Sequence, residues 1–507
     1  MKKQYIVDWY WIAAIGGAAT LLAITLLLPL GFDNDLYESM GWALYAYHGL
    51  PYIGSWDHNF PGIVFIHWSS ITLFGASDFG FRLFDYVVHI AMAALYYRLL
   101  RNWLSPRASL IGVMLYALYY ASGLWGLAGQ RDTYVGFLLI ASVILFYSIQ
   151  NNRGRKSIYS FLIGIFCGLS FLLRPTYAFF GLSFFILLWI ETKNIRTLLL
   201  YLTGCVLPSF LFLLPYFFIP NGILQVYNTI IRFNLEVYSS VHVPINVVSN
   251  GRFPIYAFAA IGIWSSLRNH SKSKKDRTMF LLLAASALIS PVMMGKYFSY
   301  HLEPLLILLI GFAALGFEQL LSYVKIPMVQ IASIILGFLL FIYAYYPRQL
   351  LRYFVEAHGS SSERIEAVYE QVLSDSLFGL ARQQQVIAFV DRGVPVNARV
   401  EYVSIFPSLR WRLRRMAPTR FTSIVPLSAY QRMVPAYSAG WRKEFIDTLI
   451  TDPAPLLIVS RSQTWWPFVG KTNDSAIRSI PKFDSVLATN YTFDTAIGGY
   501  AIYRSRK

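Results

Sequence analysis

The chain has 507 residues, of which 56% are hydrophobic and 17% aromatic, whereas only 14% are charged. This composition excludes an ordinary soluble enzyme and indicates a protein with many membrane-spanning segments. The net charge of +17 does not indicate a nucleic-acid partner, because many of the lysines and arginines lie in short loops between apolar stretches.

Apolar stretches long enough to cross a bilayer, which takes about 20 residues, recur from Trp9 to Tyr346. Lysines and arginines gather in every second connection, so the positive-inside rule predicts a cytoplasmic N-terminus and a C-terminal part outside. We therefore expect a multi-pass protein of the inner (plasma) membrane with a transmembrane domain at 1–347. The protein is predicted to be mostly α-helical, with a polytopic bundle of about eleven transmembrane helices. The predicted spans are 9–30, 78–98, 108–125, 133–149, 158–173, 177–190, 197–219, 253–267, 278–294, 302–320 and 327–346.

The first outer loop, 31–77, has an internal pattern of its own. Residues 36–49 carry apolar side chains at helical spacing and end at Gly49, which predicts a helix along the membrane interface. Residues 63–75 are apolar but too short to span a bilayer, so a second interfacial or half-buried helix is expected there.

The C-terminal part, 348–507, is predicted to be a small α/β domain outside the membrane. Short β-branched or aromatic runs predict strands at 384–393, 398–406, 454–462 and 498–507, and 441–452 has the spacing of an amphipathic helix. The basic stretch 410–416 either forms a solvated surface or contacts an anionic headgroup or substrate.

Titratable residues gather in the outer loops of this apolar chain. Any one acidic residue could cap a helix, and any one cation could snorkel to lipid headgroups. Together they suit a substrate with a lipid tail, an anionic head and an acceptor hydroxyl. The acidic and polar set is Asp33, Asp35, Glu38, Asp57, His58 and Asn59, and the second set is Arg131, Asp132, Arg174, Lys296 and His301.

This pattern favours transfer of a sugar from a polyprenyl-phosphate donor. Such a sugar is already activated, so the protein must supply a base for the acceptor hydroxyl and cations for the departing phosphate. The acceptor is a lipid, a glycan or a protein. A flippase or transporter of lipid-linked sugars, and a polymerase or ligase of surface polysaccharide, are the alternatives; the charges at one membrane face fit a transporter less well.

The run from Asp33 to Arg82, with "DNDLY", "GLPY", "SWDHNFPG" and "LFGASDFGFR", resembles the first loop and second span of the GT-C glycosyltransferases of the protein O-mannosyltransferase and aminoarabinose transferase type. "GLSFLLRP" at 168–175 and "GKYFSYHLEP" at 295–304 are similar to later segments of that family. The resemblance implies a GT-C bundle whose first loop carries the catalytic carboxylate and whose outer loops hold the lipid phosphate.

The resemblance also implies roles for individual residues. The family's acidic pair is interrupted here by Asn34, which leaves Asp33 or Asp35 as the catalytic base. Some relatives use a divalent cation, for which the acidic residues and histidines could supply ligands. No metal or other cofactor is expected to be required. The expected donor-phosphate residues are Arg131, Arg174, Lys296 and His301, and the expected substrate-pocket residues are Tyr37, Asp57, His58, Asn59 and Asp132.

Overall fold

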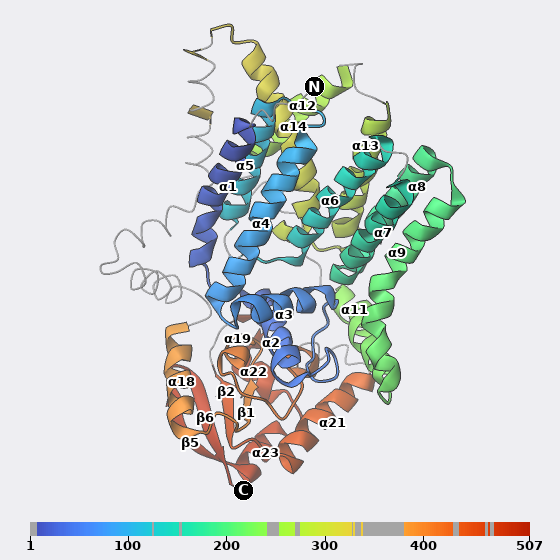
Figure 1. Cartoon of the computed structure of the whole chain (residues 1–507). Coiled ribbons are helices and arrows are strands. Elements are labelled where there is room, and N and C mark those ends of the chain that lie inside the picture. Colours follow the sequence, from blue (N-terminus) through green and yellow to red (C-terminus); the bar gives the residue numbers. More distant parts are fainter. Residues whose placement is uncertain are drawn as a thin grey trace. The chain divides into compact units, whose positions relative to one another are not determined.

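The computed structural model is mostly helical and carries a small sheet in the C-terminal part (Figure 1). It divides into two compact units, each described here by itself. The bundle unit comprises Met1–Leu28, Arg82–Leu214 and His242–Leu351, and the mixed unit comprises Pro29–Phe81, Pro215–Val241 and Arg352–Lys507. The structure describes residues 8–123, 126–151, 155–240, 253–268, 274–326, 328–329, 336–337, 380–428, 436–461, 465–466 and 471–506.

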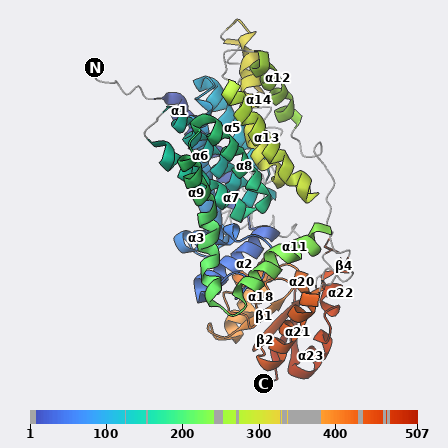
Figure 2. The same ribbon diagram turned by 90° about the vertical axis from the view of Figure 1, so that its right-hand side faces the viewer.

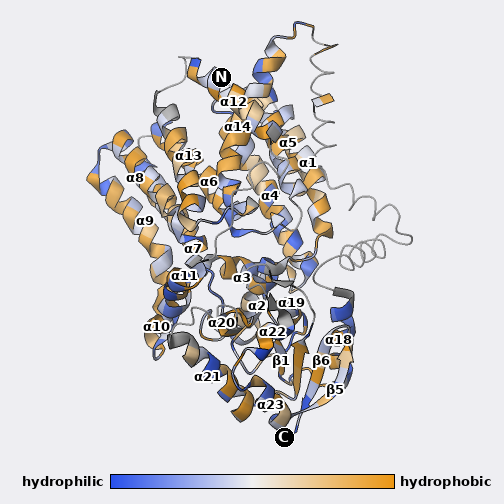
Figure 3. Cartoon of the chain, turned by 180° about the vertical axis from the view of Figure 1, so that it is seen from behind, coloured by the Kyte–Doolittle hydropathy of each residue, from blue (hydrophilic) through white to orange (hydrophobic). Residues whose placement is uncertain are grey.

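The bundle unit consists of long apolar helices, and hydrophobic residues run along most of their length (Figure 3). Seven helical segments in the described part of the chain are long and apolar enough to cross a membrane, which confirms an integral membrane protein. The helices are α1 (Trp9–Leu22, continued by Ala23–Leu27), α4 (Asp78–Leu100), α5 (Pro106–Ser122), α6 (Arg131–Asn151), α7 (Lys156–Leu173), α8 (Ala178–Thr192), α9 (Ile195–Leu213), α12 (Phe253–Arg268), α13 (Lys274–Met294) and α14 (Glu303–Ser322).

Each of the first ten predicted spans coincides with one of these helices. The eleventh, 327–346, and the predicted domain boundary at 347 lie almost wholly outside the described residues. The start of α5 is set by two residues. Ser105 caps the helix by accepting a hydrogen bond from the backbone amide of Ala108, and Pro106 occupies the first helical position.

Glycines allow two helix pairs of the bundle to pack closely. A Cβ atom on Gly262 of α12 would lie 1.9 Å from the backbone oxygen of Phe312 of α14, and one on Gly316 would lie 2.0 Å from the oxygen of Phe258. Helices α7 and α9 approach in the same way through Gly164 and Gly204. Small residues at such crossings let backbones meet where lipid offers no hydrophobic driving force.

The mixed unit begins with the first loop, which folds as the two predicted helices, α2 (Phe32–Tyr47) and α3 (Gly62–Phe74). Helix α2 ends where His48 adopts a left-handed conformation, with φ of 55°. Short helical segments follow in the same unit, namely α10 (Gly222–Val226), a π-helical turn (Tyr227–Arg232) and α11 (Phe233–Glu236).

A four-stranded sheet forms the centre of the C-terminal part, in the order β1, β2, β6, β5. Strand β1 pairs in parallel with β2, and the other pairs are antiparallel. The strands are β1 (Val400–Val403), β2 (Leu456–Ser460), β5 (Tyr491–Ile497) and β6 (Tyr500–Ser505), with a separate pair β3 (Trp465–Trp466) and β4 (Lys471–Thr472). The helices are α18 (Leu380–Gly393), α19 (Ser408–Arg412), α20 (Val425–Ser428), α21 (Ala436–Thr451), α22 (Asn473–Arg478) and α23 (Phe483–Asn490).

Both faces of this sheet are covered by apolar side chains. Alternate residues point to opposite sides, so Leu456 and Ile458 join the core beneath α18, whereas Leu457 and Val459 join the core beneath α21 and α23. Figure 2 shows the same unit from the side. The second core also holds Trp56 of the first loop, which packs edge-on against Trp441 of α21 at 5.4 Å between ring centroids.

The structure corrects one predicted element. Residues 384–393 form part of helix α18 and not a strand. Gln383, Val386 and Val390 are buried at spacings of three and four residues, which is the helical period, and this outweighs the β propensity of the valines. The predicted strands at 398–406, 454–462 and 498–507 and the predicted helix at 441–452 are confirmed.

Candidate functional site

Two aspartates occupy the first turn of α2 but differ in surroundings. Asp35 is buried and accepts hydrogen bonds from the Trp411 indole nitrogen at 2.8 Å and from Arg412 Nη1 at 2.7 Å. Asp33 is only partly buried. Carboxylates are favoured at this position because the helix N-terminus carries partial positive charge. The first turn therefore presents one fully buried carboxylate and one that is more exposed to solvent.

Arg412 joins three elements of the mixed unit. Besides Asp35, it contacts Asp78 at the start of α4, where Arg412 Nη2 lies 2.7 Å from Asp78 Oδ1. Asp78 also accepts the backbone amide of Leu30 at 2.7 Å. Burial raises the pKa of Asp35 to about 7, with Arg412 acting in the opposite direction. The basic stretch 410–416 is thus engaged with acidic residues of the chain itself, and is not simply a solvated surface.

Glu38, one turn after Asp35, forms a buried pair with His67 of α3, at 2.7 Å from Glu38 Oε2 to His67 Nδ1. Burial raises the pKa of Glu38 well above its ordinary value, and neighbouring carboxylates add to this shift. Tyr37 is 1% exposed and packs edge-on against the His67 ring. These contacts hold α2 against α3.

The second polar segment of the first loop is tightly held. Asp57 is fully buried, accepts both hydrogen bonds from the Asn59 amide at 3.0 Å, and lies 3.2 Å from His58 Nδ1. The Tyr52 hydroxyl donates to the Asn59 backbone oxygen at 2.7 Å. The His58 ring is half-buried against Tyr238, at 4.5 Å between centroids.

The expected cations meet in the bundle unit, at the start of α6, the end of α7 and the connection between α13 and α14. Arg174 and Lys296 are buried to 3% and 4% exposure. Burial lowers the pKa of Lys296 to about 7, and the charges of Arg174 and Arg131 lower it further. The His301 Nδ1 atom lies 2.6 Å from the Lys296 backbone oxygen. Three cationic side chains are therefore close enough to repel one another.

One carboxylate partly balances this cation cluster, which we define as Arg131, Arg174, Lys296 and His301. Asp132, fully buried, lies 3.0 Å from Arg174 Nη2 and accepts the Tyr177 hydroxyl. The other guanidinium nitrogen of Arg174, Nη1, is buried without a hydrogen-bond partner among the described residues. A buried donor of this kind is costly unless a ligand or water completes it. The cluster has the charge and the open donor that an anionic group requires.

A buried polar network inside the bundle was not predicted. Asp85 of α4 accepts hydrogen bonds from the hydroxyls of Tyr120 at 2.7 Å and Tyr134 at 2.9 Å, and His89 lies one turn further along the helix at 3.4 Å. The His89 ring stacks on Tyr120, at 3.7 Å between centroids. The signal was present, because Asp85 and His89 stand four residues apart within the predicted span 78–98.

The predicted site residues fall into two sets. Asp33, Asp35, Tyr37, Asp57, His58 and Asn59 belong to the mixed unit, whereas Arg131, Asp132, Arg174, Lys296 and His301 belong to the bundle unit. The bundle-unit residues interact with one another. In the mixed unit, Asp57 to Asn59 form one segment linked by side-chain contacts, whereas Asp33 to Tyr37 lie on α2. Within the described ranges, no three histidine, cysteine or acidic side chains form a group that could hold a metal ion. Trp411 and Arg412 belong to the basic stretch 410–416, and the sequence did not indicate their bonds to Asp35.

The comparisons with known proteins concern both sequence and fold. Residues 57–217 match the family described as dolichyl-phosphate-mannose-protein mannosyltransferase. ArnT from Cupriavidus metallidurans bound to undecaprenyl phosphate has a similar fold, with a TM-score of 0.62 and 12% identity over 97% of each chain. The apo state of that protein gives a TM-score of 0.58 and 13% identity, also over 97% of each chain. No curated protein has a matching sequence.

An archaeal oligosaccharyltransferase is also similar in fold. AglB from Archaeoglobus fulgidus, in complex with an inhibitory peptide and a dolichol-phosphate, gives a TM-score of 0.50 at 13% identity, over 90% of this chain and 70% of that one. At such identities the likeness concerns the fold. Together the fold and the matched segment confirm the resemblance to GT-C glycosyltransferases and the expected class of enzyme, a membrane glycosyltransferase. Within that class, residues 57–217 are similar to protein mannosyltransferases.

Proposed function

We propose that the protein transfers a sugar from a polyprenyl-phosphate donor to an acceptor hydroxyl, with Asp33 as the base. The observation that carries this assignment is the contrast on the first turn of α2. Asp35 is committed to Trp411 and Arg412, whereas Asp33 is more accessible. The buried pair of Asp35 with Arg412 holds the turn, and we assign the proton transfer to the more exposed Asp33.

In this reaction the bond between the sugar anomeric carbon and the phosphate oxygen breaks. The acceptor oxygen bonds to the anomeric carbon, and its proton passes to Asp33. Polyprenyl phosphate leaves with one more negative charge than it carried in the donor. We assign the binding of that phosphate to the cation cluster, whose buried Arg174 has an open donor. Asp33 takes up the proton of the acceptor, and the cation cluster balances the charge of the departing phosphate, so we propose no metal in this mechanism.

Support for the lipid carrier comes from the proteins of similar fold, one of which is described bound to undecaprenyl phosphate and another in complex with a dolichol-phosphate. The distribution of lysines and arginines between successive spans supports a site on the outer face of the inner membrane. The acceptor is a lipid, a glycan or a protein.

The test is the release of free polyprenyl phosphate by purified protein incubated with labelled polyprenyl-phosphate sugars and a membrane extract as acceptor source. Asp33→Asn should lower the rate by about 10²–10⁴-fold, the usual contribution of a general base. Asn34→Ala is the matched control at the neighbouring position and should retain transfer. Full activity of Asp33→Asn would refute the assignment. Movement of labelled donor across vesicles without release of polyprenyl phosphate would indicate a flippase.

A further inference from the structure

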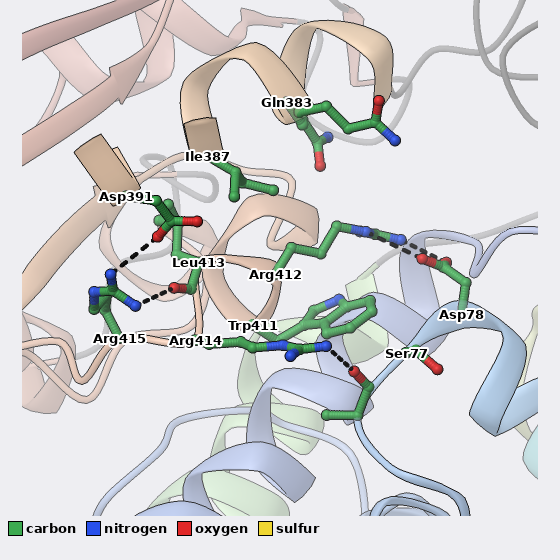
Figure 4. Close-up of a pocket in the computed structure, with 12 residues that line it drawn as sticks. Ser77, Asp78, Gln383, Ile387, Asp391, Trp411, Arg412, Leu413, Arg414 and Arg415 are labelled. Atoms are coloured by element: carbon green, nitrogen blue, oxygen red, sulfur yellow. Dashed lines mark hydrogen bonds and ion pairs between the residues drawn. The ribbon is translucent and has the colours of Figure 1, made fainter. Parts of the chain in front are cut away.

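A pocket of about 400 Å³ lies in the mixed unit, and none of the residues assigned to the reaction lines it (Figure 4). Its walls come from the turn before α4, from one face of α18 and from the end of α19 with the residues after it. Figure 4 shows Arg412 directed toward Asp78 and Arg415 directed toward Asp391, on the two sides of the view. The volume is in the range of small-ligand sites.

The chemistry of the lining is balanced and not simply cationic. Three arginines, Arg412, Arg414 and Arg415, face two aspartates, Asp78 and Asp391, with the amides of two glutamines and one serine hydroxyl beside them. Arg412 is paired with Asp78 and Arg415 with Asp391, so most of the charge is balanced within the lining. The set offers both donors and acceptors, as vicinal hydroxyl groups require. The side chains of Ile387, Leu413 and Trp411 supply apolar surface among the polar groups.

The polar groups are held in place before any ligand arrives. Arg415 Nη2 donates to Asp391 at 2.9 Å, Gln383 Nε2 donates to the Ser408 hydroxyl at 2.7 Å, and Arg414 Nη2 donates to the Ala76 oxygen at 2.9 Å. Arg415 is 7% exposed, and its Nε atom has no hydrogen-bond partner among the described residues. Preorganised groups lose little conformational entropy when a ligand binds.

We propose that this pocket binds an uncharged saccharide unit of the acceptor, which makes the acceptor a glycan or a glycolipid. The assignment to the acceptor rests on the proposed function. We assign the pocket to the acceptor because Arg412 lines the pocket and also contacts Asp35, which lies two residues from the proposed base. The base acts on the acceptor hydroxyl, so a pocket whose wall is fixed to the same helical turn suits the acceptor.

The test is direct binding of saccharides to the full chain, purified in a detergent without a sugar headgroup. Saturation-transfer difference NMR would use chitobiose, maltose and lactose as neutral probes. Inorganic phosphate is the anionic probe, and broadening of its phosphorus NMR signal would report its binding. We expect at least one neutral disaccharide to bind, and the double variant Gln384→Ala, Arg414→Gln to bind it at least tenfold more weakly. Both side chains are exposed, so the change should leave the fold intact, which a melting curve checks.

The same helix provides a matched control. Gln385 and Arg392 of α18 are exposed but do not line the pocket, so Gln385→Ala, Arg392→Gln should bind like the wild type. The proposal is overturned if no neutral saccharide binds, if both double variants bind equally well, or if phosphate binds in their place. The donor is not needed for this measurement. Full transfer activity of Asp33→Asn would therefore refute Asp33 as the base and leave the pocket proposal standing. A failure of saccharides to bind would refute the pocket proposal and leave Asp33 as the base.

Discussion

The depressed pKa of Lys296 makes donor binding sensitive to pH in a defined direction. Burial and two arginines lower this pKa to about 7, so the ammonium group is half deprotonated near neutrality. A bound phosphodiester favours the charged form and raises the pKa again. Above pH 7, binding therefore requires the uptake of a proton, and affinity falls as the pH rises. Below pH 6 the ammonium group of Lys296 is already charged, so its titration no longer makes the affinity depend on pH.

The magnitude follows from the same pKa. Between pH 6 and pH 8 the protonated fraction of a group with a pKa near 7 changes about tenfold, so the dissociation constant of the donor should rise about tenfold, or about 1.4 kcal/mol. The donor is suitable for this test because a phosphodiester does not titrate in this range, whereas a phosphate monoester would.

The assay is equilibrium binding of a labelled polyprenyl-phosphate sugar at pH 6, 7 and 8. Lys296→Arg is the control, because a guanidinium remains charged at all three values and its affinity should be independent of pH. Arginine side chains stay charged in this range, whereas His301 is a second titratable group in the cluster. An unchanged pH dependence in Lys296→Arg would refute the reasoning and assign the effect to another group.

Three further predictions concern stability. Gly262→Ala should destabilise the protein by about 1–3 kcal/mol through the clash with α14, whereas Gly16→Ala, with open space around it, should be neutral or stabilising; equal melting temperatures would contradict this. Asp85→Asn should cost roughly 1–3 kcal/mol, because the two tyrosine hydroxyls donate to different carboxylate oxygens and an NH2 group in place of one oxygen leaves one hydroxyl without its acceptor. Chemical denaturation in detergent would measure this loss. Trp56→Ala should cost about 3–5 kcal/mol by leaving a cavity against Trp441, and a loss below 1 kcal/mol in the same measurement would argue against that packing.

The bundle was predictable because span length and hydropathy are local properties. A helix in lipid must satisfy its own backbone hydrogen bonds, so an apolar stretch of sufficient length has few alternatives. The strands of the C-terminal part were harder. Strand β5 was missed because most of its residues are exposed and polar, and α18 was taken for a strand because its valines favour both structures.

The candidate site was predictable in membership but not in detail. The sequence placed Asp33 and Asp35 at the start of an interfacial helix, and no local feature could separate them. What distinguishes them is Trp411 and Arg412, which belong to a basic stretch whose partners lie far away along the chain. The pairing of Arg174 with Asp132 likewise depends on how α6 and α7 pack, which periodicity does not reveal.

The bond between Trp411 and Asp35 joins residues 376 positions apart, and this has a consequence for biosynthesis. At about 5–20 residues per second, roughly 20–75 s separate the synthesis of the two partners. The first loop must wait through the insertion of most of the chain before the contacts that secure the turn of Asp33 and Asp35 exist. A ribosome that stalls late, or a nonsense mutation near the 3′ end of the message, would therefore disable the beginning of the protein as well as its end.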